Sequence, residues 1–436
     1  MKKISILTIS FFMFTFIILN FTAFSAPAPQ EQSKNKVKYE PYQKDKVLDE
    51  IETKQKDLQK KLDDETQKIQ DLQKTEKDTK EKEKQVLKSD LTGVYPPKSL
   101  EEFKQCFHFS PVAQYLTSTC WSFSTTSYLE SEIYRLTGKK IKLSEMWAPY
   151  FEMIEKCRRF ITERGESTVS GGAQSNSVNR IWKEHGIVPA DVYPGVKNKD
   201  DKFNHDPLMA EIDSYLKYIK DNNLWDEEEN LKHVVLILNK YMGEPPKTFT
   251  YNGKTMTPLE FLHNETGLNM DDYYAAISTS RFPFYTMAEY KFPDNWWHSK
   301  DYINLPLDVW YNIIKKAIQS GNTLVLSGDV SEPGYRGEND VAFIPTCDIP
   351  GKYIDQDSRE YRIYNKTSED DHGIHVVGYK QYKGEDWFLI KDSGRSSRKG
   401  KFAGYLFFRG DFIKLKMLAI TIHKDLLKDI LPKIKK

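Results

Sequence analysis

Residues 114–124 read Gln-Tyr-Leu-Thr-Ser-Thr-Cys-Trp-Ser-Phe-Ser, and no other stretch of the chain carries a stronger structural signal. The three hydroxyl residues at 117–119 favour a helix start directly before Cys120. Apolar residues continue at helical spacing as far as Leu136, and Gly138 then provides a helix end. We therefore expect Cys120 in the first turn of a largely buried helix, where the helix dipole stabilises a thiolate.

A second block, residues 371–379, reads Asp-His-Gly-Ile-His-Val-Val-Gly-Tyr and has the composition of a strand that opens at His372. Another strand is expected at 387–391, after a short polar turn. Antiparallel pairing of the two would bring Asp392 back beside His372. An imidazole near the thiol stabilises the thiolate, and a carboxylate orients the imidazole. The sequence thus predicts a catalytic triad of Cys120, His372 and Asp392.

Each of these residues has an ordinary alternative role. A lone Cys before an apolar helix is usually a small buried residue, and a lone His at a strand start is usually a capping or surface residue. The joint presence of Cys120 and His372, with Gln114 six residues before the first and Gly378 six after the second, favours catalysis. His375 lies at an odd offset from His372, so it should face the opposite side of the strand and serve packing or hydrogen bonding.

Both blocks resemble the papain superfamily of cysteine peptidases, and within it the bleomycin hydrolase/aminopeptidase C group, over about residues 98–429. The resemblance implies an α+β, papain-like two-lobe fold with a helical left lobe and an antiparallel β right lobe. The cleft between the lobes would place Cys120 on one wall and His372 on the other. The resemblance further implies a side-chain oxyanion donor at Gln114 and a substrate-binding pair at Gly171 and Gly172.

The spacing of the two blocks favours the bleomycin hydrolase branch. Papain separates its Cys and His by roughly 130–150 residues, whereas Cys120 and His372 are much further apart here. The excess falls at about residues 200–305, which read as a helical, polar insert. Residues 243–251 and 320–330 also resemble segments of that branch.

Three positions depart from the family pattern. Asp392 replaces the usual Asn, which adds negative charge beside the imidazole and could move the pH optimum. Gly394 replaces a Trp that shields the pair, which puts shielding in question. Thr117 replaces a disulfide-forming Cys, so that bridge is absent.

Three functions follow as hypotheses. The first is a thiol peptidase, aminopeptidase-like by resemblance, whose substrates are peptides. In that branch a chain terminus occupies part of the cleft, and without it endopeptidase action would result. The second is a catalytically silent papain-fold binding protein, motivated by the changes at Asp392 and Gly394. The third is another acyl transfer of transglutaminase type, which Gln114 and the Leu-Ser-Glu segment at residues 143–145 disfavour.

Composition excludes other classes of function. The 436 residues carry a net charge of +1 and no basic excess for nucleic acid. Glycine-rich phosphate loops, CxxC pairs and HExxH motifs are missing from the sequence, so we expect neither a cofactor nor a metal site. With Cys120 as nucleophile, three cysteines remain and at most one disulfide can form, and we expect mostly buried free thiols.

The N-terminal residues 1–25 have a basic start, an apolar run and small residues near Ser25, as in a secretory signal peptide. They predict export to the periplasm or medium, while an uncleaved signal would attach the chain to a membrane. Residues 26–92 read as a linker and a charged helical arm with apolar residues at heptad positions. The arm is either a solvated spacer or a coiled coil for homo-oligomerisation or attachment. The papain-like domain is expected at 93–436.

Overall fold

The computed structural model describes residues 35–198 and 201–435. The expected signal segment, residues 1–25, lies outside the described residues. By its internal contacts the chain divides into two units, one ending at Lys84 and one beginning at Gln85. The predicted boundary between the arm and the papain-like domain at residue 92 stays a prediction.

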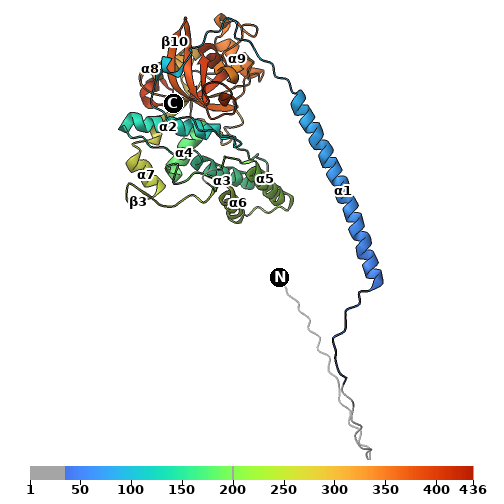
Figure 1. Ribbon diagram of the computed structural model, residues 1–436. Coiled ribbons are helices and arrows are strands. Elements are labelled where there is room, and N and C mark those ends of the chain that lie inside the picture. Colours follow the sequence, from blue (N-terminus) through green and yellow to red (C-terminus); the bar gives the residue numbers. More distant parts are fainter. Residues whose placement is uncertain (1–34, 199–200, 436) are drawn as a thin grey trace, which may run out of the picture. The chain divides into compact units, whose positions relative to one another are not determined.

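The first unit contains one long helix, α1 (Lys46–Glu83) (Figure 1). The side chain of Asp45 caps its start by accepting from the amides of Val47 and Leu48, and none of its residues is buried. The heptad stripe therefore faces solvent, and coiled-coil pairing stays a prediction; the exposed stripe residues are Leu48, Ile51, Leu58, Leu62, Ile69 and Leu72. None of the helices in the described residues is long and apolar enough to cross a membrane.

The second unit has a helical lobe whose first helix, α2 (Cys120–Thr137), is largely buried. It ends where predicted, at Gly138, whose φ of 73° is a left-handed cap that glycine adopts without strain. The other elements of this lobe are α3 (Trp147–Thr162), α4 (Ser175–His185), α5 (Asp206–Asp221), α6 (Glu227–Met242), α7 (Pro258–Glu265) and the hairpin β2 (Phe249–Tyr251) with β3 (Lys254–Met256).

The β lobe is built on one large sheet in the order β5-β6-β4-β13-β7-β10-β11-β12-β9-β8, with β1 paired to β10. Most neighbours are antiparallel, as expected, but β4–β6 and β9–β12 are parallel. The strands are β1 (Lys104–Gln105), β4 (Tyr273–Ile277), β5 (Thr286–Ala288), β6 (Tyr302–Asn304), β7 (Leu324–Gly328), β8 (Tyr335–Arg336), β9 (Val341–Ala342), β10 (His372–Tyr382), β11 (Glu385–Lys391), β12 (Tyr405–Arg409) and β13 (Met417–His423). The α+β, two-lobe fold is thereby confirmed.

Three helices accompany the sheet: α8 (Leu307–Gln319), α9 (Gln356–Tyr364) and α10 (Gly410–Lys416). Arg359 anchors α9, because its fully buried guanidinium donates to the backbone carbonyls of Ser278, Lys414, Met417 and Leu418 at 2.5–3.1 Å. Burial lowers the pKa of Arg359 to about 10.

The insert differs in one respect from the helical segment expected at 200–305. Its first part forms α5 and α6, but β4, β5 and β6 join the main sheet, and β4 pairs with β13. These strands are three to five residues long. Such short apolar runs have no periodicity that separates a strand from a helix.

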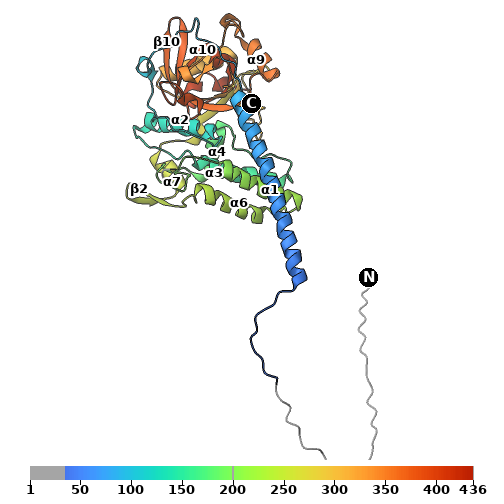
Figure 2. The ribbon, with the colours of Figure 1, turned by 45° about the vertical axis from the view of Figure 1, so that its right-hand side comes forward.

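The two lobes meet along α2, which runs between the sheet and the other helices of the helical lobe in both views (Figures 1 and 2). A Cβ on Gly373 in β10 would lie 2.9 Å from Ser124 Oγ and 3.2 Å from Trp121 Cα, so only glycine permits this approach. Deeper along the same strand, His375 Nδ1 lies 2.8 Å from Ser127 Oγ on α2. This contact gives His375 the packing and hydrogen-bonding place expected for it.

Candidate active site

Cys120 is the first residue of α2 and is half-buried. In the described part of the chain no side chain caps the helix at Thr119. The amides of Ser122 and Phe123 donate to the Thr119 carbonyl, whereas those of Cys120 and Trp121 have no acceptor among the described residues. The partial positive charge of these two amides favours a thiolate or an oxyanion at this end. All four cysteines are free. Cys157 is buried, Cys106 and Cys120 are half-buried and Cys347 is exposed, so the expectation of mostly buried thiols holds only in part.

His372 and Asp392 lie together, as antiparallel pairing of β10 and β11 predicted. His372 Nε2 donates to Asp392 Oδ1 at 2.7 Å. That bond fixes the ring, so Nδ1 is the nitrogen left to face a thiol. The side chain of Asp392 is fully covered, and 10% of the His372 side chain is exposed.

The electrostatics of this pair favour an imidazolium. Burial alone would lower the pKa of His372, but the charge of Asp392, the Cys120 sulfur and hydrogen bonds to both raise it well above its usual range. Burial likewise opposes ionisation of Asp392, yet His372 and hydrogen bonds from Gly394 and Tyr335 lower the pKa of that carboxyl. A positive imidazole between a carboxylate and a thiol is the arrangement that activates sulfur as a nucleophile.

Gly394 stands where the family has a shielding Trp, yet the His372–Asp392 pair is still covered. Gly394 donates its amide to Asp392 Oδ1 at 2.8 Å, and a Cβ there would lie 3.1 Å from two atoms of the His372 ring. The backbone of Gly394 thus covers the ring directly. On the other side, the Tyr335 hydroxyl donates to Asp392 Oδ2 at 3.3 Å. Tyr335 lies in a short strand without a motif, and no feature of the sequence identifies it.

Gln114 lies in the loop before α2 and is tied to the residue after Asp392. The backbone N–H of Gln114 donates to the Ser393 carbonyl at 3.0 Å, and the side-chain Oε1 of Gln114 accepts from Ser393 Oγ at 2.7 Å. The side-chain NH₂ group is therefore the end of Gln114 that is left for a ligand. An oxyanion near Cys120 could be stabilised by this group together with the Cys120 amide.

The glycine pair lies against the same loop. Trp121 Nε1 donates to the Gly171 carbonyl at 3.0 Å. A Cβ on Gly171 would lie 2.8 Å from the Thr117 carbonyl, and one on Gly172 would lie 2.5 Å from the carboxylate of Asp294. Thr117, in place of the family Cys, holds the loop with hydrogen bonds to the Gln114 carbonyl and to Thr119. The glycine pair is thereby placed beside the start of α2.

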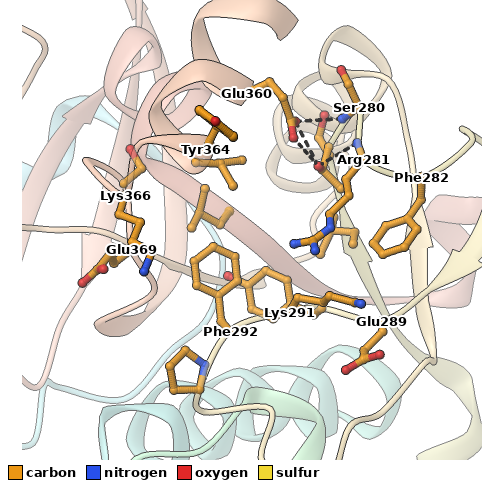
Figure 3. Close-up of a pocket in the computed structure, with 18 residues that line it drawn as sticks. Ser280, Arg281, Phe282, Glu289, Lys291, Phe292, Glu360, Tyr364, Lys366 and Glu369 are labelled. Carbon is orange, nitrogen blue, oxygen red and sulfur yellow. Dashed lines mark hydrogen bonds between the residues drawn. The ribbon is translucent and has the colours of Figure 1, made fainter.

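A cavity of about 740 Å³ lies apart from these groups, among Phe282, Tyr290 and Phe292 with charged residues at its rim (Figure 3). Glu360 closes one side by accepting from Thr279 Oγ1 and from the Ser280 amide. Cys120 is not among the residues that line it. Within residues 35–198 and 201–435, no group of three or more His, Cys, Asp or Glu side chains could hold a metal ion.

Comparisons with known proteins identify the family of the chain. The sequence profile of the Peptidase C1-like family matches residues 48–435. Pro-cathepsin H from Mus musculus is 30% identical over 147 residues, which cover 33% of this chain and 40% of that protein. Aminopeptidase C from Lactobacillus delbrueckii subsp. lactis is 22% identical over 263 residues, which cover 50% and 58%. These matches span about half the length of the relatives.

The fold has a counterpart among solved structures. PepW from Lactobacillus rhamnosis HN001 superposes with a TM-score of 0.64 at 16% identity, covering 85% of this chain and 94% of that one. Together with aminopeptidase C, it supports the bleomycin hydrolase/aminopeptidase C-like branch. The chain belongs to the Peptidase C1-like family of papain-like cysteine peptidases.

Proposed function

We propose that this protein is an exported thiol peptidase that acts on peptides with a free amino terminus, through Cys120, His372 and Asp392. The observation that carries the proposal is the covered 2.7 Å hydrogen bond from His372 to Asp392, on a strand that packs against the thiol-bearing end of α2. The similarity to aminopeptidase C supports the choice of an amino-terminal substrate.

The residues suggest an order of steps. The Cys120 thiolate attacks the scissile carbonyl, and the oxygen that becomes negative is stabilised by Gln114 and the Cys120 amide. His372 then gives its proton to the leaving amine, which breaks the C–N bond and leaves a thioester. Water, losing a proton to His372, hydrolyses the thioester and restores the thiol. Asp392 keeps the ring oriented throughout and stabilises its charged form.

Turnover of two fluorogenic substrates under reducing conditions tests the proposal. One carries a free α-amine and the other is N-blocked, and wild type is compared with Cys120→Ala. We expect turnover of the free-amine substrate, lost in Cys120→Ala. A folded wild-type protein that turns over neither substrate would instead support the silent binding protein.

Export is a separate part of the proposal, and it rests on the sequence of residues 1–25. We expect the mature protein to be recovered outside the cytoplasm with its amino terminus at Ala26. Mass spectrometry of the amino-terminal peptide checks this. Recovery of the uncleaved chain in the membrane fraction would replace secretion with membrane attachment.

A further inference from the structure

Tyr335 belongs to a short loop at residues 333–338, the covering loop, which brings its hydroxyl to Asp392. The hydroxyl donates to Asp392 Oδ2 at 3.3 Å. Burial raises the pKa of Tyr335 well above its usual range, and Asp392 raises it further, so the hydroxyl stays protonated as a donor. The other oxygen of Asp392 accepts from His372. The position of the covering loop therefore decides how the carboxylate that orients His372 is covered.

The same loop supports the second cover of the catalytic pair. A Cβ on Gly337 would collide with the Ser396 carbonyl, so the two backbones are in close contact. Ser396 lies two residues after Gly394, whose backbone covers the His372 ring. Both covers thus depend on the covering loop, one directly and the other through Ser396.

Ser89, in the segment that follows α1, holds the covering loop through its backbone. The N–H of Ser89 donates to the Pro333 carbonyl at 2.9 Å, and the carbonyl of Ser89 accepts from the Arg336 guanidinium. These two contacts lie on either side of Tyr335 in the sequence. Ser89 therefore bridges the loop at the residues that determine where Tyr335 can reach.

An ion pair reinforces this bridge. Lys88 Nζ lies 2.6 Å from Glu338 Oε1, and Arg336 Nε donates to the same oxygen at 2.9 Å. Burial opposes ionisation of Glu338, but Lys88, Arg336 and a backbone hydrogen bond lower its pKa to about 2. Lys88 and Glu338 are both partly exposed, so their pairing alone contributes little free energy. The backbone contacts of Ser89 are therefore the stronger part of the bridge.

The segment that carries Ser89 is anchored in the β lobe. Val94 is 8% exposed and belongs to an apolar cluster with Phe343 and Trp387. Leu91 packs against the same cluster. Ser89 is thus connected to the core of the lobe within a few residues, which gives the bridge a fixed base.

A cavity of about 400 Å³ lies next to this bridge. Tyr335 lines it, and so do Val86 and Leu87 from the segment after α1. The cavity is large enough to hold water. Asp392 is fully covered and is not among the lining residues, so Tyr335 separates the carboxylate from the cavity. Displacement of the covering loop would admit water to the His372–Asp392 hydrogen bond and weaken the interaction between the two charges.

We propose that Lys88 and Ser89 are positioning residues of the candidate active site. They hold the covering loop so that Tyr335 keeps water from the hydrogen bond between His372 and Asp392. This inference rests on the proposed function, because it gives the segment after α1 a part in the same reaction. That segment would then support the catalytic pair and would not be a spacer alone.

A purely structural role for the bridge makes a different prediction. Breaking it would then lower stability and leave the surroundings of the catalytic pair unchanged. The Nε2 proton of His372 separates the two cases, because a proton in a covered hydrogen bond exchanges slowly with water. Its exchange rate can be measured without any substrate.

The test is NMR measurement of water exchange at the His372 Nε2 proton in the full chain labelled with ¹⁵N-histidine. The resonance is identified by its loss in His372→Gln. Ser89→Pro removes the N–H that donates to Pro333. We expect it to accelerate exchange at least about tenfold and to lower kcat/KM for the free-amine substrate about tenfold.

Gln85→Pro is the matched control and should change neither quantity. Gln85 lies in the same segment, and its N–H has no acceptor among the described residues. The preceding Lys84 is extended, with ψ of 115°, as a residue before proline prefers. A proline at this position therefore tests the substitution without breaking the bridge.

Two more variants complete the test. Arg336→Met breaks the bridge from the loop side and should accelerate exchange as Ser89→Pro does, which covers the case in which Ser89→Pro does not fold. Adding Ser89→Pro to Tyr335→Leu should accelerate exchange no further, because the bridge acts through Tyr335. Thermal melting of each variant shows that it is folded.

Unchanged exchange in folded bridge variants, equal acceleration in Gln85→Pro, or a further increase in the double variant would each overturn the proposal. So would a wild-type proton that already exchanges too fast to detect, or faster exchange with unchanged kcat/KM. Exchange that depends on the bridge, in a wild-type protein without peptidase turnover, would uphold the cover and refute the proposed function.

Discussion

Replacing Asp392 by Asn removes a charge from the candidate site while keeping its shape. In the structure, Asp392 Oδ1 accepts from His372 Nε2 at 2.7 Å and from the Gly394 amide at 2.8 Å. An Asn oxygen can accept both bonds. The Asn amide would then face the Tyr335 hydroxyl, 3.3 Å from Oδ2, which can turn to accept. The imidazole should keep its orientation and lose the carboxylate.

The magnitude follows from the difference between a charged and a neutral acceptor. A hydrogen bond to a charged group contributes roughly 1–1.5 kcal/mol more than a neutral one. One pH unit corresponds to about 1.36 kcal/mol. Asp392 raises the pKa of His372 against the effect of burial, so its loss should lower that pKa. The alkaline limb of activity, where the imidazolium loses its proton, should move to lower pH by about one pH unit.

The assay is kcat/KM against pH for wild type and Asp392→Asn, with the free-amine substrate. Asp301→Asn serves as a control for loss of a carboxylate away from the site. An alkaline limb at the same pH in Asp392→Asn, with the protein folded, would refute the role given to the Asp392 charge. A limb that moves to higher pH would show that the carboxylate of Asp392 lowers the pKa of His372 and does not raise it.

Three further changes have defined outcomes. Gly394→Ala places a Cβ 3.1 Å from the His372 ring, so kcat/KM should fall about tenfold with an almost unchanged melting temperature; unchanged kinetics would contradict the packing argument. Gln114→Ala should lower kcat by about 10²–10³ with little change in KM in steady-state assays, whereas a loss confined to KM would assign Gln114 to substrate binding. Arg359→Met should lower the free energy of unfolding by about 3 kcal/mol, because four backbone carbonyls lose their donor; a urea midpoint equal to that of wild type would contradict this.

The sequence could predict those parts of the fold and site that depend on local pattern. Helical spacing after Cys120 and the strand that opens at His372 are both present in the structure, and pairing of β10 with β11 brings Asp392 to His372. These features depend on periodicity and on short-range pairing, which neighbouring residues encode.

Other parts depend on contacts between distant segments. Tyr335 reaches Asp392, and Asp294 reaches Gly172, only after the insert and the β lobe have packed. Neither residue belongs to a motif, and the three-residue strand β5 has too few positions to show a period. The sequence also could not show whether the His372–Asp392 pair stays covered without the family Trp. The cover comes from the backbone of Gly394, which lies close to the His372 ring only in the folded structure.

The most direct test of the central claim is mass spectrometry of the products from a free-amine decapeptide and from its N-acetylated form, each incubated with wild type or Cys120→Ala. We predict that wild type shortens the free-amine peptide from its amino end and leaves the acetylated peptide intact, and that Cys120→Ala leaves both peptides intact. Internal cleavage of the acetylated peptide, or the same products from Cys120→Ala, would contradict the account.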